Sequence, residues 1–364
     1  MHPTIVKIDY QALRDNFIAV QKRFPGKKMA PVIKADGYGH GIIETARAFI
    51  EGGAEILSVF RVEEAEKLRK NGIDTHVWVL LGPLPAEAQR AARLRNITYG
   101  IFSIDQAQAL NRACLDAGTK AAVHIAIDTG MGRLGFTPEE APSAIAQIAA
   151  LPALELKGAY SHLAKAAEPS SAVTQAQIAG FRKAIAALPK DCNENHICAS
   201  DALLNNIMPE LGYARPGICL YAESFLPGED IPLTRDAMSL ESAIVSLKRL
   251  PKGSTISYGS IHTLQRDSLV AIAPLGYDDG LLRSLSNRFQ ALVHGKRANQ
   301  LGRICMSMIM IDVTDIPDAA IGDQVVIMGR QGNEKITVNE LTAIAGTTQH
   351  EFLCAFGRNR ETLQ

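Results

Sequence analysis

The chain has 364 residues, a length that suggests two domains. Its 38 Lys and Arg residues balance its 38 Asp and Glu residues, so it lacks the basic excess of nucleic-acid-binding proteins and of polybasic membrane-surface proteins. Hydrophobic residues make up 47% and charged residues 21%, which excludes disorder or a coiled coil for the bulk of the chain.

Three further features bear on the compartment. No apolar run approaches the roughly 18 residues that a membrane-spanning helix needs. The opening segment 1–4 lacks the basic and apolar regions of a signal peptide. The six cysteines are scattered without a Cys-x-x-Cys pair, which argues against a disulfide scaffold or a zinc ribbon. We therefore expect a cytoplasmic protein with no nucleic-acid partner, no membrane partner and no metal.

The first two thirds of the chain alternate short apolar runs with amphipathic stretches. The apolar runs predict eight strands, at Lys28–Ile33, Glu55–Val59, His76–Leu81, Ile97–Phe102, Ala121–Ile127, Leu154–Tyr160, Asn195–Ala199 and Ala214–Tyr221. The amphipathic stretches predict helices, among them Ile42–Glu51, Val62–Asn71 and Ile104–Ala117. Ser103 and Gln106 form the pattern of a capping box at the start of the last of these. This alternation favours an α/β fold with an N-terminal (β/α)₈ barrel of the TIM type.

The pattern changes after about residue 233, where turn residues separate short β-like segments. These predict the strands Ala243–Leu247, Leu269–Pro274, Phe289–Val293, Met308–Val313 and Gln324–Met328. We therefore expect a barrel domain over residues 1–233 and a C-terminal β-rich domain over residues 234–364. Residues 1–9 are expected to contribute a strand to the second domain, and Asp9 is a plausible N-cap of the following helix.

The segment 30–41 reads Ala-Pro-Val-Ile-Lys-Ala-Asp-Gly-Tyr-Gly-His-Gly and places Lys34 at the end of the first predicted barrel strand. Barrel active sites form at that end of the strands, and a buried lysine that loses its proton can act as a Schiff-base nucleophile. A lone strand-end lysine is more often simply solvated. The flanking glycines and Tyr38 favour the functional interpretation, because they supply a bend and a group that can face an anionic ligand.

Four further motifs follow, each ambiguous alone. Residues 128–135, Asp-Thr-Gly-Met-Gly-Arg-Leu-Gly, present Arg133, whose planar guanidinium suits a carboxylate or a phenolate. A Tyr-Ser-His run ends in His162, which by itself is more often structural. Ser200 and the Arg-Pro-Gly-Ile run 215–218 follow the last two predicted strands, where barrels commonly hold phosphate. Ile-Ser-Tyr-Gly-Ser, residues 256–260, could be a β-turn with a packed Tyr258.

In this order the motifs resemble those of the alanine racemases, a family that depends on pyridoxal 5'-phosphate (PLP), and the resemblance covers essentially the whole chain. It implies that Lys34 carries the cofactor covalently and that Arg133 and Met306 position the substrate carboxylate. The cofactor-binding set that it implies is Lys34, Tyr38, His162, Ser200, Arg215, Gly217 and Ile218. Arg215 would face the pyridine nitrogen and, with a pKa above roughly 12, would leave it unprotonated. A related decarboxylase is therefore less favoured, since such enzymes place an acidic residue there.

The resemblance also implies a mechanism. Inverting a stereocentre requires a proton donor and a proton acceptor on opposite faces, and these would be Lys34 and Tyr258. Tyr258 would come from the partner chain of a head-to-tail homodimer, with His162 and Arg215 supplying a positive field around it. The implied activity is an isomerase that interconverts L- and D-alanine and supplies D-alanine for bacterial peptidoglycan.

Three departures from the family pattern surround the expected pocket. Ala126 replaces a carbamylated lysine that would brace Arg133, Ser307 replaces an aspartate, and His350 replaces a tyrosine that touches the cofactor phosphate. Tyr277 is expected at the entrance. These changes leave open a racemase for serine or for a basic amino acid. A non-catalytic PLP carrier is the alternative from another class, and the motif around Tyr258 argues against it.

Overall fold

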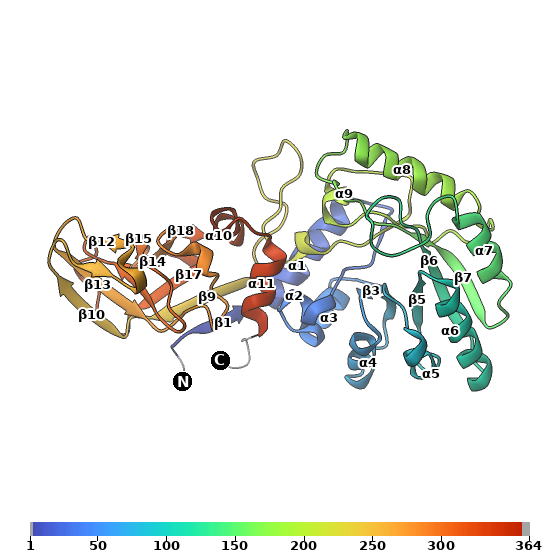
Figure 1. Ribbon diagram of the computed structural model, residues 1–364, viewed down its shortest axis with the longest axis horizontal. Coiled ribbons are helices and arrows are strands. Elements are labelled where there is room, and N and C mark those ends of the chain that lie inside the picture. The colour runs from blue at the N-terminus through green and yellow to red at the C-terminus, as the bar shows by residue number, and fades with distance from the viewer. Residues whose placement is uncertain (1–2, 359–364) are drawn as a thin grey trace.

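The computed structural model describes residues 3–358. The first two residues, part of the segment expected to lack a signal peptide, lie outside that range. Two lobes lie side by side along the longest axis of the molecule, with the parallel strands and most helices in one and the antiparallel strands in the other (Figure 1). The predicted α/β barrel followed by a β-rich domain is confirmed.

Parallel strands form the barrel. Their bounds are β2 (Lys28–Met29), β3 (Ile56–Val59), β4 (His76–Val79), β5 (Ile97–Ile101), β6 (Ala121–Ala126), β7 (Leu154–Tyr160) and β8 (Tyr213–Ala214). Strands β3 to β7 pair in sequence order, and β2 pairs with β8. Single parallel bridges join Val32 to Ser58 and Tyr160 to His196. The Arg215 N–H donates to the Cys198 carbonyl over 2.8 Å, so the segment 196–198 takes the place of the seventh predicted strand and links β7 to β8.

The helices of the barrel lobe follow their caps and their apolar periodicity. Their bounds are α1 (Tyr10–Arg23), α2 (Lys34–Tyr38), α3 (Ile42–Glu51), α4 (Val62–Lys70), η1 (Pro85–Glu87), α5 (Ala88–Ala91), α6 (Ile104–Ala117), α7 (Ala141–Ala149), α8 (Ala172–Ile185) and α9 (Ser200–Leu204). The Asp9 carboxylate accepts from the Ala12 N–H, as predicted. Ser103 Oγ accepts from the Gln106 N–H, and the Gln106 side chain accepts from the Phe102 N–H.

Two predicted strands need correction. The run Ala214–Tyr221 leaves the barrel after Ala214 and turns into the 3₁₀ helix η2 (Ile218–Leu220), because Pro216 has no N–H to offer a neighbouring strand. The run Ala243–Leu247 is not one strand: one strand ends at Ala243 and the next begins at Ser246. Because the residues between them are also apolar, the sequence does not reveal this break.

Within residues 3–358, nine strands form the sheet of the second lobe, and all of their pairings are antiparallel. Their bounds are β1 (Ile5–Ile8), β9 (Met238–Ala243), β10 (Ser246–Leu250), β13 (Ser268–Ala273), β14 (Gln290–Val293), β15 (Lys296–Leu301), β16 (Ile309–Asp312), β17 (Gln324–Gln331) and β18 (Glu334–Ile336). The remaining elements are β11 (Thr255–Ile256), β12 (His262–Thr263), η3 (Tyr258–Ser260), η4 (Arg283–Leu285), α10 (Val338–Ala345) and α11 (Gln349–Arg358). Because β1 pairs with β9, the start of the chain belongs to this sheet.

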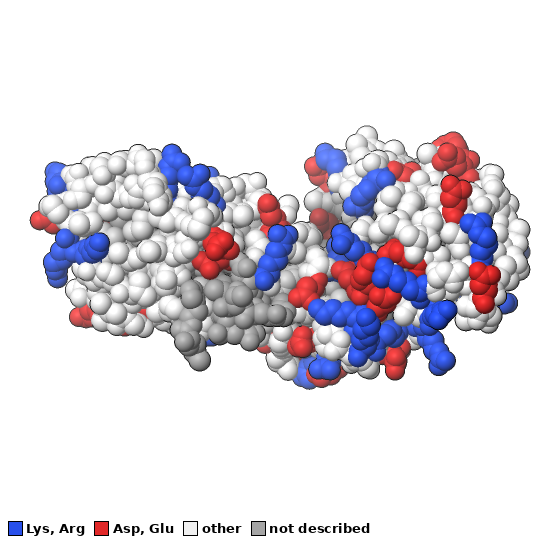
Figure 2. All heavy atoms as spheres, turned by 60° about the horizontal axis from the view of Figure 1, so that its bottom comes forward, with Lys and Arg blue, Asp and Glu red and all other residues white. Residues whose placement is uncertain are grey.

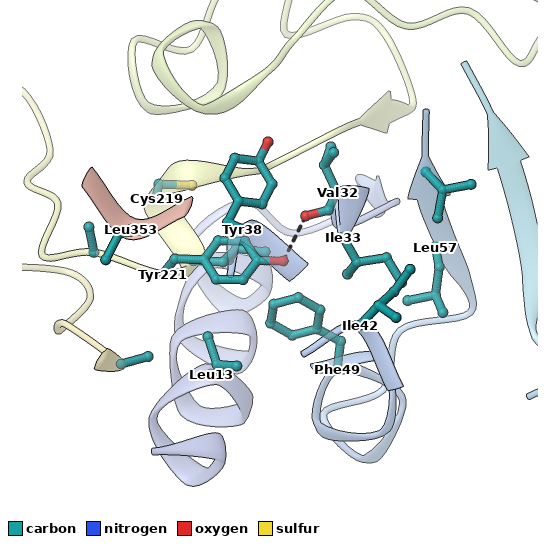
Figure 3. Packing of buried hydrophobic residues seen from close by; sticks show 14 of the residues in the cluster. Leu13, Val32, Ile33, Tyr38, Ile42, Phe49, Leu57, Cys219, Tyr221 and Leu353 are labelled. Carbon is teal, nitrogen blue, oxygen red and sulfur yellow. Dashed lines mark hydrogen bonds between the residues drawn. The ribbon is translucent and has the colours of Figure 1, made fainter. Parts of the chain in front are cut away.

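Buried aromatic rings pack beneath the first barrel loop. The rings of Tyr38 and Tyr221 lie 4.7 Å apart, and the Tyr221 hydroxyl donates to the Val32 carbonyl over 2.8 Å (Figure 3). From the second lobe, α11 packs against α2 so closely that a Cβ atom at Gly39 would lie 2.9 Å from the Gly357 Cα (Figure 1). Only glycines permit this contact between the two lobes.

Acidic and basic side chains are interspersed over the barrel lobe, in keeping with the zero net charge (Figure 2). Arg90, for example, pairs with Glu63, Glu66 and Glu87. No helix of the described residues is long and apolar enough to span a membrane.

Candidate active site

The short helix α2, which starts at Lys34, is left-handed after its first residue. Residues Ala35, Asp36, Gly37, Tyr38 and Gly39 all have positive φ, between 53° and 85°. A left-handed conformation costs roughly 1–2 kcal/mol for each residue with a side chain. The surrounding contacts must therefore hold the turn, and its geometry sets the position of Lys34 at the mouth of the barrel.

The carboxylate of Glu64 supplies the main contact to this turn. One oxygen accepts from the Ala35 N–H over 2.7 Å, and the other accepts from the N–H groups of Phe60 and Arg61 over 2.8 and 3.0 Å. Glu64 thereby fastens the peptide after Lys34 to the start of α4. Sequence reasoning missed this residue, although a glutamate three residues into a helix after a strand end is a typical capping signal.

A cavity of about 610 Å³ opens at the carboxyl ends of the barrel strands. Among its lining residues are nine of the predicted site residues: Lys34, Tyr38, Arg133, His162, Ser200, Arg215, Gly217, Ile218 and His350. They come from helices and loops spread over more than 300 residues of sequence: the barrel lobe supplies eight of them, and α11 of the second lobe supplies His350.

Three cations, Lys34, Arg133 and Arg215, and two carboxylates, Asp128 and Asp201, line this cavity. Burial and the nearby Arg133 lower the pKa of Lys34, so its amine loses its proton more readily than an exposed lysine. Burial, together with Arg215 and Arg133, lowers the pKa of His162 to about 3 and keeps its ring neutral. Among the described residues, no ion pair involves Lys34, Arg133 or Arg215. Cations gathered without carboxylate partners favour an anionic ligand.

The loop of Arg133 is shaped by Asp128. The Asp128 carboxylate accepts from the backbone N–H groups of Gly130, Met131, Gly132 and Arg133 over 2.8–3.1 Å. Burial opposes the charge, but these four donors outweigh it and lower the pKa of Asp128. The carboxylate therefore stays ionised and folds the loop that carries Arg133.

Two of the three departures line the cavity. Ala126 ends β6 with only 1% of its surface exposed, and its methyl group offers no anion to Arg133. The ring of His350 lies 5.5 Å from that of Tyr38. Burial and the nearby Lys34 lower the pKa of His350, so this histidine narrows the cavity as a neutral ring rather than as a further cation.

The floor of the cavity joins Tyr38 to the segment after β8. A Cβ atom at Gly217 would lie 2.7 Å from Tyr38 Oη, so only glycine leaves room for the tyrosine hydroxyl there. Ser200 Oγ accepts from the N–H groups of Gly217 and Cys219 over 3.0 and 3.2 Å. These contacts hold two hydroxyl groups and a bend of backbone at one end of the cavity.

Arg215 is buried, with 3% of its surface exposed, and it bonds to Ser161 and His196 rather than to His162, with which we expected it to supply a positive field. Its guanidinium donates to the Ser161 carbonyl over 2.8 Å and to both the ring and the carbonyl of His196. Sequence reasoning missed His196, which lies inside a predicted strand and carries no motif signal.

The remaining predicted residues lie on the second lobe and do not line this cavity. Tyr258 is 69% exposed, Met306 55% and Tyr277 42%, and Ser307 is exposed beside them. Ser257 Oγ donates to the Arg303 carbonyl and the Tyr277 N–H to the Cys305 carbonyl, which draws their loops together. We call this group the tyrosine face. It adjoins the β11–β12 hairpin, and its Tyr277 loop reaches α11, since a Cβ atom at Gly280 would lie 2.9 Å from the Ala355 carbonyl.

Family models match almost the whole chain: "Alanine racemase, N-terminal domain" matches residues 8–224 and "Alanine racemase, C-terminal domain" matches residues 237–363. The alanine racemases of Syntrophobacter fumaroxidans and Citrifermentans bemidjiense are each 38% identical to it, over 98% of this chain and 96% and 97% of theirs. The crystal structure of alanine racemase from E. faecalis superposes with a TM-score of 0.88 at 29% identity, covering 98% of this chain and 96% of that one. The biosynthetic enzyme of Pseudomonas aeruginosa gives 0.87 at 29% identity, over 98% and 97%. The chain therefore belongs to the alanine racemase family.

Proposed function

We propose that this protein binds PLP through Lys34 and interconverts L- and D-alanine. The observation that carries the proposal is the gathering of Lys34, Arg133 and Arg215 in one cavity without carboxylate partners. The family relationship supports the same activity. The proposal extends to a cytoplasmic enzyme that supplies D-alanine for peptidoglycan, with its catalytic work divided between domains 1–233 and 234–364.

The residues present fit the cofactor. Tyr38 and Ser200, with the backbone of Gly217 and Ile218, form a polar cradle that would hold a phosphate. The close approach of Gly217 to Tyr38 would be blocked by any side chain at that position. Lys34, with its lowered pKa, would hold the cofactor covalently, and Arg215 would meet its ring nitrogen.

PLP bound in this way withdraws electrons from the substrate's α-carbon and so makes its proton acidic. The residues then divide the remaining work. Lys34 would exchange the proton on one face, and Tyr258 of the partner subunit would exchange it on the other. Arg133 and Met306 would hold the substrate carboxylate. Arg215, with a pKa of about 10 even after burial, keeps its own proton and would leave the ring nitrogen unprotonated.

Exposure of the tyrosine face supports a shared site. A tyrosine that acts as a base must leave bulk water, yet Tyr258 is largely exposed within one chain. A head-to-tail dimer would place this face over the cavity of the other subunit, as symmetric dimers permit. Each of the two sites would then contain Lys34 from one chain and Tyr258 from the other.

The activity is tested by exchange of the α-proton of L-alanine in heavy water, with product chirality measured in the same samples. Serine and lysine run in parallel because Ala126, Ser307 and His350 change size or charge around the pocket. Exchange with inversion of alanine is the expected result. Preference for serine or lysine would correct the substrate, and bound PLP without exchange of any of the three would overturn the racemase proposal.

The shared site is tested by mixing two inactive variants, Lys34→Ala and Tyr258→Phe, after reversible dissociation. Each single variant should lose about 100-fold or more of the activity, since each removes a proton-transfer group. Random reassociation should restore about a quarter of wild-type activity, because half of the dimers are mixed and each mixed dimer has one intact site. In the control, Tyr258→Phe is mixed instead with Lys70→Ala, which changes an exposed lysine of α4 and leaves Lys34 in place. No recovery on mixing would place Tyr258 in the same chain's site or outside the mechanism.

A further inference from the structure

A chain of side chains runs through the barrel beneath the cavity and ends at Arg215. The Glu194 carboxylate contacts His124 Nε2 over 3.0 Å. His124 Nδ1 contacts His196 Nε2 over 3.0 Å, and His196 Nδ1 contacts the Arg215 guanidinium. We call these four residues the relay. The relay begins at Glu194, just before the segment 196–198. It ends at Arg215, which directly follows β8 and lines the cavity.

Counting protons gives the relay a single direction. Arginine only donates and an ionised carboxylate only accepts. His196 Nδ1 must therefore accept from Arg215, which leaves the ring proton on His196 Nε2. That proton is donated to His124 Nδ1, so the proton of His124 lies on Nε2 and is donated to Glu194. Every contact is satisfied only if both histidines are neutral and carry their proton on Nε2.

The surroundings suit neutral rings at both positions. His124 and His196 have 2% and 0% of their surface exposed, and burial lowers the pKa of both. Glu194 is the solvent-exposed end of the relay, with 28% of its side chain exposed. Burial disfavours its charge, but the hydrogen bond from His124 outweighs that effect and lowers its pKa.

Aromatic rings hold the histidine nearest Arg215 in place. Trp78 stacks on His196 with ring centroids 4.2 Å apart and planes 13° apart, and Tyr160 stacks on it at 5.4 Å and 10°. Trp78 also meets His124 edge-on at 4.9 Å. Since the rings cannot turn freely, the proton positions in the relay set the direction of its final hydrogen bond.

We propose that Glu194, His124 and His196 are positioning residues for Arg215, and that the relay fixes both the proton positions and the orientation of the guanidinium beneath the cofactor ring. The buried arginine is thereby coupled through two neutral imidazoles to a solvated carboxylate on the far side of the barrel. The claim about Arg215 and the ring rests on the proposed function, whereas the claim about proton positions does not.

The test uses ¹⁵N-histidine NMR of the full-length dimer, because the two nitrogens of a neutral imidazole differ in ¹⁵N shift according to which carries the proton. Single His→Gln variants assign the signals. In the wild type we expect His124 and His196 to be neutral with the proton on Nε2. A proton on Nδ1 of either ring, or a doubly protonated ring at neutral pH, would overturn the relay.

Glu194→Gln then tests the coupling, since a neutral amide oxygen accepts from His124 less strongly than a carboxylate does, while Arg215 at the other end still fixes the direction. We expect both rings to keep their proton on Nε2, the ¹⁵N signals of His124 and His196 to move because the terminal hydrogen bond is weaker, and kcat for alanine to fall about 10-fold with KM changed less than about 2-fold. The matched control is Glu155→Gln, an exposed carboxylate paired with Lys157 outside the relay. An unmoved His196 signal in Glu194→Gln would refute the coupling. A moved His196 signal with unchanged kcat would overturn the positioning role. The NMR result does not depend on the racemase proposal, whereas the kcat result does.

Discussion

The cavity of the barrel and the tyrosine face of the second lobe are built in opposite ways. Apart from Arg133 and His350, the predicted site residues of the cavity are buried or half-buried, and side-chain contacts orient them: Glu64 holds the turn after Lys34, and His196 holds Arg215. The tyrosine face is exposed, and mainly contacts to backbone carbonyls hold its loops. The difference teaches that one chain builds most of the cavity by itself, whereas it leaves the tyrosine face open to solvent.

The largest expected effect comes from removing the Glu64 carboxylate, which holds the turn after Lys34. Glu64→Ala leaves three backbone N–H groups without their acceptor and releases the left-handed turn, so Lys34 should lose its position. We expect about a 100-fold loss of kcat/KM, the scale of a misplaced catalytic group. Unfolding in urea should show a loss of about 2 kcal/mol. Glu63→Ala, on the exposed side of the same helix, is the control. Wild-type activity in Glu64→Ala would mean that the left-handed turn is stable without the hydrogen bonds to Glu64.

A smaller effect is expected where the cavity floor is tightest. Gly217→Ala places a methyl group 2.7 Å from Tyr38 Oη and should displace that hydroxyl. We expect PLP affinity to fall about 10-fold, because about 1.4 kcal/mol of contact is lost, as measured by titration of the absorbance of bound cofactor. At Gly212 an added Cβ atom meets nothing within 4 Å, so Gly212→Ala is the matched control. Equal affinities for the two variants would remove Tyr38 and Gly217 from the cofactor cradle.

The smallest expected effect concerns the electrostatics of the cavity, where His162 is kept neutral. His162 has a pKa of about 3 in the folded protein, against roughly 6.5 when unfolded. Between those values the unfolded chain binds a proton that the folded chain does not, so stability falls as pH falls through this window. His162→Asn should reduce the slope of unfolding free energy against pH by about one proton, or about 1.4 kcal/mol per pH unit, near pH 5. Urea unfolding from pH 7 to pH 4 measures it. An identical slope would mean that His162 is not held neutral.

Local signals explain what the sequence could predict. The helices α3 and α6 have the predicted bounds, because apolar periodicity and the Ser103 cap depend only on neighbours in the chain. The cavity residues could be predicted because they belong to motifs that end barrel strands. Strand β15 was missed, because its residues are mostly polar and its first two are exposed. Such a strand becomes evident only beside its partners.

The misses at the site have a different origin. The left-handed turn after Lys34 depends on Glu64, 29 residues further along the chain, and nothing in the local pattern reports that contact. His196 meets Arg215 only because the barrel brings two strand ends together. The family resemblance could assign Tyr258 to a partner, but no property of a single chain predicts which surface will be covered.

The glycine contact between α2 and α11 has a consequence for the order of events during synthesis. Lys34 leaves the ribosome early, but Gly357, against which its turn packs, is made more than 300 residues later. A nascent chain can therefore assemble most of the barrel before the helix that closes over the Lys34 turn exists. The Lys34 turn reaches its final packing only after residue 357 is made, and a ribosome that stops before that point releases a barrel whose Lys34 turn is not yet covered.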